Sequence, residues 1–197
     1  MSIFNLEEQN SNIDYKIVAG LERLSQVYRI LLWQKAKEHG LSPIQIQLLI
    51  FIHSHSAEKN TVSYLAREFN LTKATISDAI KVLEHKKLIN KCTATTDTRS
   101  YTITLTPEGE QIMLQAQDYT GPLTGLISGT DEGNKKVLWQ TIVDVISQLN
   151  KMKIISIQRT CYNCKHFKPG GNSGYCSLLN KELAIADIRI DCAEFVQ

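Results

Sequence analysis

The chain has 197 residues, of which 43% are hydrophobic, and a formal net charge of +2. It is long enough for one domain with an appendage and can bury a core, whereas its modest charge does not by itself indicate nucleic acid. The N-terminus lacks the features of a signal peptide, and no run approaches the ~18 apolar residues of a membrane span. We therefore expect a cytoplasmic protein without membrane contact, whose five cysteines are ligands or free thiols rather than disulfides.

The N-terminal third predicts two helices. Residues 1–12 are polar and expected to form a flexible N-terminus. Residues 13–39 then repeat apolar side chains every three or four positions, which predicts a long helix ended by Gly40. A second helix is expected from Pro43 to about His55, with proline at its first position. His53 and His55 are two residues apart and would point in different directions, so surface histidines are favoured over metal ligands.

A helix-turn-helix is predicted next. Two short amphipathic segments flank the polar link Asn70-Leu71-Thr72. Thr72 is a good N-cap for the second segment, in which Ile76, Ile80 and Leu83 form an apolar stripe at helical spacing. In such a motif the N-terminal part of the second helix enters the DNA major groove.

Two β-type segments then predict a wing. Residues 88–95 form the first strand and residues 100–106, with alternating apolar and threonine side chains, form the second. The polar segment Thr96–Arg99 is expected to be the turn between them. An arginine at a wing tip suits a narrow minor groove, where the potential is most negative.

At this point the chain resembles a known family. The motif Asp97-x-Arg99-Ser100-x-x-Ile103-x-Leu105-Thr106-x-x-Gly109 is similar to the wing signature of the MarR family of bacterial transcription regulators. Leu65-Ala66, Ala74-Thr75-Ile76-Ser77, Leu83-Glu84 and Leu88-Ile89 fit the same family. The resemblance covers roughly residues 13–153.

The resemblance implies a mainly α fold with a small β-hairpin wing (α+β). This is a winged helix-turn-helix with long N- and C-terminal dimerisation helices. It implies that the second helix reads bases, that the wing Arg99 enters the minor groove and that Asp97 steadies Arg99. The candidate DNA-binding residues are Thr72, Lys73, Ala74, Thr75, Ser77, Asp78, Lys81, Asp97 and Arg99.

Two positions depart from the family pattern. Asp78 stands where many relatives have a basic residue; a carboxylate repels phosphate but can accept a hydrogen bond from a cytosine amino group. Lys87 replaces the glycine that usually follows the second helix, where a left-handed conformation is often needed. Asp78 therefore leaves the target sequence open.

The C-terminal helices predict a dimer. Thr106 and Pro107 begin a helix that reaches toward Tyr119, and Gly121-Pro122 interrupts it. A last long helix is expected over residues 131–153, with Thr130 as N-cap. Its apolar stripe is too wide for one small domain, so a homodimer is favoured over packing within one chain.

The tail, residues 154–197, carries four of the five cysteines: Cys161, Cys164, Cys176 and Cys192. Cysteine thiolates select zinc, iron–sulfur clusters or copper(I), so we predict one four-cysteine metal site per chain, with His166 as an alternative ligand. One C-x2-C pair plus two single cysteines is similar to high-potential iron–sulfur proteins and to cluster subunits of glycyl-radical enzymes. That similarity favours a [4Fe-4S] cluster, with structural zinc as the close alternative.

Two further features of the cysteines and aromatics leave alternatives open. The tail aromatics could cover a cluster or could simply pack a small module; they are Tyr162, Phe167, Tyr175 and Phe195. The fifth cysteine, Cys92, is predicted to be a half-buried strand residue rather than a redox sensor.

The leading hypothesis divides the chain into residues 1–12, 13–153 and 154–197. It is a homodimeric, sequence-specific transcription regulator that binds pseudo-palindromic double-stranded DNA, stabilised or modulated by the metal site and possessing a potential small-molecule effector site. The alternative is an interaction or electron-transfer protein whose winged helix does not bind DNA. We find no nucleophile–base pair, phosphate loop or paired carboxylates, so an enzyme is not expected.

Overall fold

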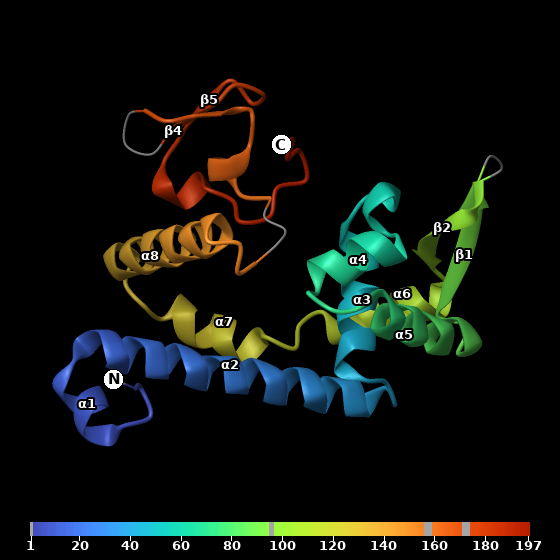
Figure 1. Ribbon diagram of the computed structural model, residues 1–197, viewed down its shortest axis with the longest axis horizontal. Coiled ribbons are helices and arrows are strands. Elements are labelled where there is room, and N and C mark those ends of the chain that lie inside the picture. The colour runs from blue at the N-terminus through green and yellow to red at the C-terminus, as the bar shows by residue number, and fades with distance from the viewer. Residues whose placement is uncertain (1, 95–96, 156–158, 171–173) are drawn as a thin grey trace. The chain divides into compact units, whose positions relative to one another are not determined.

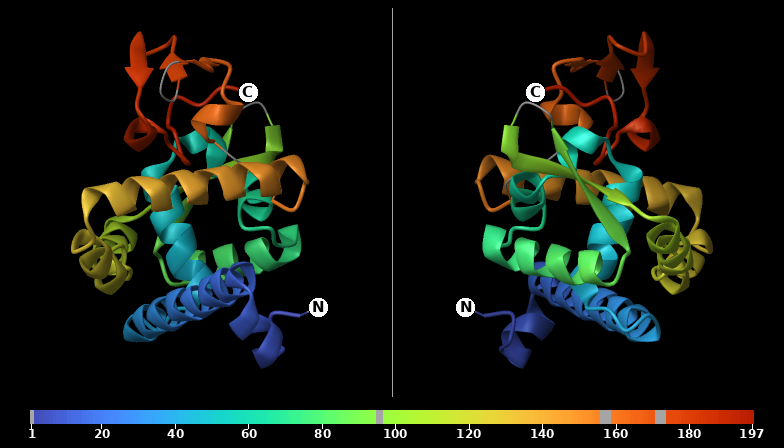
Figure 2. Two further views of the ribbon diagram at one scale, coloured as in Figure 1. Left: turned by 90° about the vertical axis from the view of Figure 1, so that its left-hand side faces the viewer. Right: turned by 90° about the vertical axis from the view of Figure 1, so that its right-hand side faces the viewer.

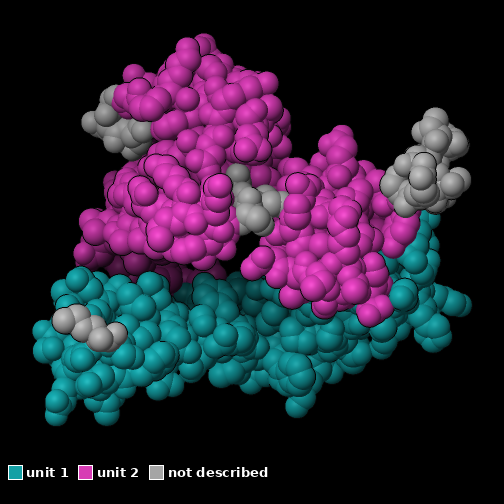
Figure 3. All heavy atoms as spheres, in the orientation of Figure 1, with its two compact units in different colours: residues 1–54, 79–91, 104–123 teal, residues 55–78, 92–103, 124–197 magenta. Residues whose placement is uncertain are grey.

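The computed structural model describes residues 2–94, 97–155, 159–170 and 174–197, with side chains outside residues 93–100. The chain separates into two compact units, which Figure 3 shows in different colours. The first consists of residues 1–54, 79–91 and 104–123, and the second of residues 55–78, 92–103 and 124–197. The domain boundaries expected after residues 12 and 153 stay a prediction.

The first unit begins with two helices, α1 and α2 (Figure 1). Helix α1, Leu6–Ser11, was not predicted from the polar N-terminal sequence; the side chain of Asn5 caps it by accepting from the backbone of Glu7 at 3.0 Å. Helix α2 covers Ile13–Glu38, close to the predicted range, and Gly40 follows it in a left-handed conformation. Among its side chains only two are buried, those of Leu32 and Ala36.

The core of the first unit forms around α3, Pro43–Ser54, which packs against α2 and α6. Its fully buried side chains include those of Ile46, Leu48 and Leu49. Helix α6, Pro107–Ala116, begins with the predicted cap, since Thr106 Oγ1 accepts from the Gly109 backbone at 3.1 Å. It ends at Ala116, before the predicted reach toward Tyr119.

Several elements of the winged helix contribute to both units. They are α5, Lys73–His85, and the strands β1, Ile89–Ala94, and β2, Asp97–Leu105, which pair in a two-stranded sheet. Helix α7, Gly121–Ser128, starts at the glycine where an interruption was predicted. These elements follow the order expected for a helix-turn-helix with a wing.

The second unit contains α4, Val62–Glu68, and α8, Glu132–Lys151, as well as a short 3₁₀ helix over Ala57–Lys59. The N-cap of α8 is Asp131 and not Thr130 as predicted. Its carboxylate accepts from the backbones of Gly133 and Asn134 at 3.0 and 3.1 Å. A carboxylate at this position also interacts favourably with the helix dipole.

The tail forms a small module on α8. It has 3₁₀ helices at Cys161–Asn163 and Ile185–Asp187, and a three-stranded sheet of β3 (Phe167–Lys168), β4 (Gly174–Cys176) and β5 (Lys181–Leu183). Both Figure 1 and Figure 2 show this module beside α8. Val143 of α8 joins Leu183 and Ile188 in a buried cluster, and the Trp139 indole donates to the Ile185 carbonyl at 3.1 Å.

Candidate nucleic-acid interface and cysteine site

The turn between α4 and α5 has the predicted helix-turn-helix geometry. Asn70 adopts a left-handed conformation with φ of 51°, and the Leu71 backbone donates to the Ala66 carbonyl at 2.9 Å. Thr72 then acts as the N-cap of α5, because its Oγ1 accepts from the backbone of Thr75 at 3.1 Å. Asparagine tolerates the left-handed region better than most residues, which explains how the chain reverses without glycine.

Helix α5 has one buried and one exposed face. Ile76, Ile80 and Leu83 are completely buried, as the apolar stripe predicted. Ser77 is partly exposed, and the exposed candidates on or just before the helix are Thr72, Lys73, Ala74, Thr75, Asp78 and Lys81. The residues expected to meet bases or phosphates are therefore accessible, and they include the carboxylate of Asp78.

The wing differs in detail from the prediction. Asp97–Arg99 belong to β2, not to the turn, while Thr96 lies outside the described residues. The side chains of Asp97 and Arg99 are also outside the described part, so their predicted pairing stays a prediction. Cys92 is exposed and not half-buried as expected.

Lys87 confirms the expected left-handed exit of α5, with φ of 59°. The Lys87 and Leu88 backbones donate to the carbonyls of Glu84 and Leu83 at 2.8 and 2.9 Å, which is the Schellman pattern. Thr106 Oγ1 donates to the Lys87 carbonyl at 2.7 Å. Gly109 is required beside this exit, since a Cβ there would lie 2.0 Å from the Leu88 carbonyl oxygen.

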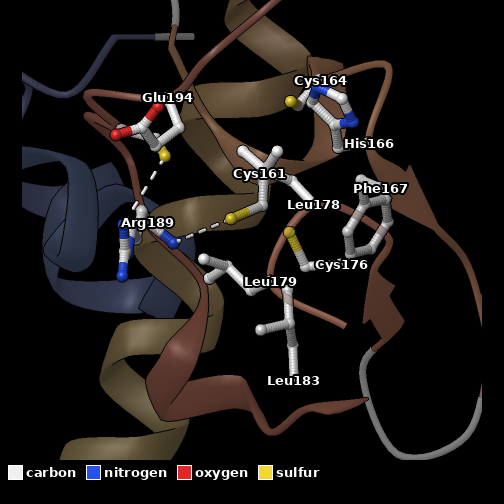
Figure 4. A pocket seen from close by; sticks show the side chains of 11 residues that line it. Cys161, Cys164, His166, Phe167, Cys176, Leu178, Leu179, Leu183, Arg189 and Glu194 are labelled. Atoms are coloured by element: carbon white, nitrogen blue, oxygen red, sulfur yellow. Dashed lines mark hydrogen bonds between the residues drawn. The ribbon is translucent and has the colours of Figure 1, made fainter. Parts of the chain in front are cut away.

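The four tail cysteines line one hollow (Figure 4). Cys161 begins a 3₁₀ turn that Cys164 ends, and β4 brings in Cys176 opposite Phe167 of β3. The fourth member, Cys192, follows the last 3₁₀ helix. Apolar side chains surround the sulfurs, namely those of Phe167, Leu178, Leu179 and Leu183. Of the four aromatic residues predicted to cover the site, Phe167 lines the hollow. The ring of Tyr162 packs edge-on against the ring of Phe167.

Two N–H groups of one residue approach the cysteine sulfurs. The backbone N–H of Arg189 donates to Cys161 Sγ at 3.3 Å, and its guanidinium Nη1 donates to Cys192 Sγ at 3.6 Å. Burial raises the pKa of Cys161, and the Arg189 backbone bond partly opposes this. Within the described part of the chain, no three Cys, His, Asp or Glu side chains are grouped closely enough to hold a metal ion as they stand. His166 lies beside Cys164 at the hollow (Figure 4).

The sequence did not predict a buried, charged side chain in the second unit, that of Arg159. Arg159 is only 6% exposed, and its guanidinium forms ion pairs with Glu68 of α4 and Asp191 of the tail. Burial alone would lower the pKa of Arg159, but these two carboxylates outweigh burial and raise it. Burial opposes ionisation of Asp191, yet Arg159 and then His55 hold its pKa below the usual value. No local pattern reveals this set, because the contacts are long-range; His55, expected at the surface, instead pairs with Asp191 at 3.1 Å.

Comparisons with known proteins agree with this geometry. A family profile, MarR_2, described as the MarR family, matches residues 39–100. A MarR protein from Peptoclostridium difficile has a TM-score of 0.60 at 19% identity, with 72% of this chain and 92% of that chain covered. The S. aureus MepR–DNA complex has a TM-score of 0.57 at 22% identity, with 66% and 94% covered.

A further solved structure is Streptococcus pneumoniae FabT in complex with DNA, with a TM-score of 0.56 at 19% identity and 70% and 99% covered. No curated protein sequence matches the chain. The family match ends before the cysteine tail. No helix in the described ranges combines the length and the hydropathy needed to cross a membrane. A MarR-family model therefore matches residues 39–100 of this chain, and the likeness to these solved structures shows that its fold is a winged helix-turn-helix.

Proposed function

We propose that this protein is a homodimeric, sequence-specific DNA-binding transcription regulator. The exposed face of α5 carries this proposal, since it presents Lys73, Thr75 and Ser77 at the start of a well-capped helix after a helix-turn-helix link. Similar folds are found in DNA complexes of MepR and FabT. In this arrangement lysine and arginine contacts to phosphate supply affinity, while base contacts from α5 supply specificity.

The homodimer is part of the same proposal. Helix α2 leaves large apolar side chains exposed along most of its length: Ile13, Ile17, Val18, Leu21, Leu24, Val27, Tyr28, Ile30 and Trp33. Such a row on a long helix is typical of an interface. A two-fold dimer would set two copies of α5 about one DNA turn apart on a pseudo-palindrome. A small-molecule effector between the dimer helices and the winged domain remains part of this proposal.

We further propose one metal site per chain at Cys161, Cys164, Cys176 and Cys192. Its support is that all four side chains line one hollow together with apolar side chains. Arg189 also donates hydrogen bonds to the sulfurs of Cys161 and Cys192. The sulfurs would have to be drawn together on binding, as is common for sites that form with their metal. A [4Fe-4S] cluster is the leading occupant, and structural zinc is the alternative.

The DNA role can be tested without knowing the operator. The purified dimer is used to select binders from a random double-stranded DNA library, and affinity for the selected fragment is measured by anisotropy over a salt series. We expect a pseudo-palindromic consensus. Lys73→Ala should weaken binding and reduce the salt slope by about one, whereas Lys181→Ala, which removes an exposed lysine of the tail, should change neither. Absence of any enriched sequence would contradict DNA binding and favour an interaction or electron-transfer role.

The metal site needs a separate measurement. Anaerobically purified protein is examined by metal analysis and visible absorption. A broad charge-transfer band with about four irons per chain indicates the cluster, and one zinc per chain without visible absorption indicates zinc. Cys176→Ser should remove the metal, whereas Cys92→Ser should retain it. Wild-type protein that binds neither metal would contradict the proposed site.

A further inference from the structure

The guanidinium of Arg159 uses all five of its N–H donors. Two go to the Asp191 carboxylate, from Nε and from Nη2. Two more go to the Glu68 carboxylate, from Nη1 at 2.7 Å and from Nη2 at 3.0 Å. The last goes from Nη1 to the Tyr64 hydroxyl at 2.8 Å. Since arginine has five donors in a rigid planar fork, this side chain connects α4 and the tail in a single defined geometry.

Arg159 and Asp191 lie on the two backbone segments that also carry Cys161 and Cys192. The Cys192 N–H donates to the Arg159 carbonyl at 3.1 Å, and the Cys161 N–H donates to the Arg189 carbonyl at 3.0 Å. Arg159 and Asp191 also form an isolated parallel bridge. The segments 159–161 and 189–192 therefore run side by side, with a cysteine at the end of each. Any change in the separation of Cys161 and Cys192 acts directly on the segments that carry Arg159 and Asp191.

The other side of the connection leads to the DNA-reading helix. Glu68 is the last residue of α4, and Tyr64 lies about one turn before it. The link after Glu68 is short and hydrogen-bonded, and it ends at Thr72, the N-cap of α5. The end of α4 that Arg159 holds is thus four residues from the first candidate DNA contact.

We propose that Arg159 is a positioning residue that transmits occupancy of the four-cysteine site to α4, and through α4 to DNA affinity. This proposal rests on the metal site proposed above. A bound metal pulls the Cys161 and Cys192 thiolates together and thereby fixes the segments 159–161 and 189–192. Asp191 then holds the guanidinium in the orientation that grips Glu68. Without metal only hydrogen bonds and ion pairs hold these segments, so they open more often, the ion pair with Glu68 is broken for more of the time, and the start of α5 is less firmly positioned.

The test compares DNA affinity with and without metal in matched variants. Anaerobically purified dimer and chelator-stripped dimer are titrated with the selected DNA fragment. We expect the wild type to lose about tenfold in affinity on stripping, within the usual range of coupling between sites. Glu68→Gln keeps the size of the side chain but removes the charge that pairs with Arg159. In this variant the ratio of DNA affinities with and without metal should fall to less than about threefold. Glu182→Gln removes an exposed tail carboxylate and should keep the wild-type ratio.

A second readout separates failure of this coupling from failure of the DNA role. Amide hydrogen exchange of residues 62–70 is measured without DNA in the same samples. Removal of the metal should speed amide exchange in the wild type. In Glu68→Gln, the same treatment should change the exchange rate little. If no DNA binds but the exchange result holds, the coupling between the cysteine site and α4 stands, whereas the DNA role and the effect on DNA affinity fall. Equal wild-type exchange with and without metal, equal affinity ratios in wild type and Glu68→Gln, or protein that takes up no metal would each overturn the coupling. Arg159 itself is retained, since its removal would leave two carboxylates facing each other.

Discussion

At the scale of single residues, Lys87 shows what a departure from the family pattern costs. It ends α5 at φ of 59°, in a region that L side chains adopt at a cost of about 1–2 kcal/mol. Lys87→Gly should therefore raise the free energy of unfolding by about 1 kcal/mol. The measurement is chemical denaturation. Lys87→Ala removes the same side chain but keeps the Cβ, so it should give less than about half this gain; an equal gain would mean that charge, not conformation, is responsible.

Arg189 should tune the cysteine site. Its guanidinium donates to Cys192 Sγ, and this bond raises the pKa of Arg189. Four thiolates around a metal carry net negative charge, which a neighbouring cation and N–H donors offset. Arg189→Gln should weaken metal binding by about tenfold or more, measured by competition with a chelator. Arg189→Lys keeps the charge and should lose less. Unchanged metal affinity in Arg189→Gln would show that the guanidinium of Arg189 does not contribute to metal binding.

The residues that sequence could and could not predict differ in the range of their contacts. The Thr72 cap and the buried Ile76 and Ile80 depend on neighbours within one or two helical turns, so local spacing predicted them. Cysteine spacing predicted a metal site, which stays a prediction, although the four cysteines do line one hollow. Arg159 bonds to residues 91 and 95 positions earlier, and neither partner stands out locally. The exposure of Cys92 was mispredicted because the face of a short edge-forming strand depends on what covers it.

At the scale of elements, α8 serves as the platform of the tail. Trp139 bonds to the Ile185 carbonyl and packs against the cluster that includes Val143 and Leu183. The described residues of the tail include few other buried apolar side chains, and a module of this size usually needs a staple such as a metal. The fold of the tail on α8 is therefore expected to depend on the cysteine site.

Tryptophan fluorescence can report on this dependence, because the chain has only two tryptophans. In a Trp33→Phe variant, Trp139 is the sole indole. Its emission should shift to longer wavelength when the metal is removed, since the indole becomes more exposed. In the matched Trp139→Phe variant, the signal comes from Trp33 of α2 and should remain constant. A constant Trp139 signal would mean that the tail stays folded without metal.

At the scale of the whole molecule, the exposed apolar row of α2 should determine the assembly state. Leu24 is 47% exposed within one chain, and a charge there would be buried at a dimer interface. Leu24→Glu should therefore convert the dimer to a monomer and weaken binding to the pseudo-palindrome by at least tenfold, because both half-sites can no longer be engaged together. Sedimentation and anisotropy measure the two effects.

The control for this prediction is Gln34→Glu, which adds the same charge at an exposed polar position of α2 and should remain dimeric. A Leu24→Glu variant that sediments as a dimer would place the interface elsewhere. Helix α8 then becomes the next surface to test, through its exposed Val137, Leu138 and Val145.

The contact between α8 and the tail has a practical consequence for dissecting the protein. Removing the residues after Lys153 would do more than delete the proposed metal site. It would uncover Val143, remove the bonding partner of Trp139, and leave Glu68 without the arginine that neutralises it. Such a truncated protein would expose apolar surface on one face of α8 and would lack the ion pair at the end of α4. The 197-residue chain treated to remove any bound metal is therefore the proper reference state for the proposed site.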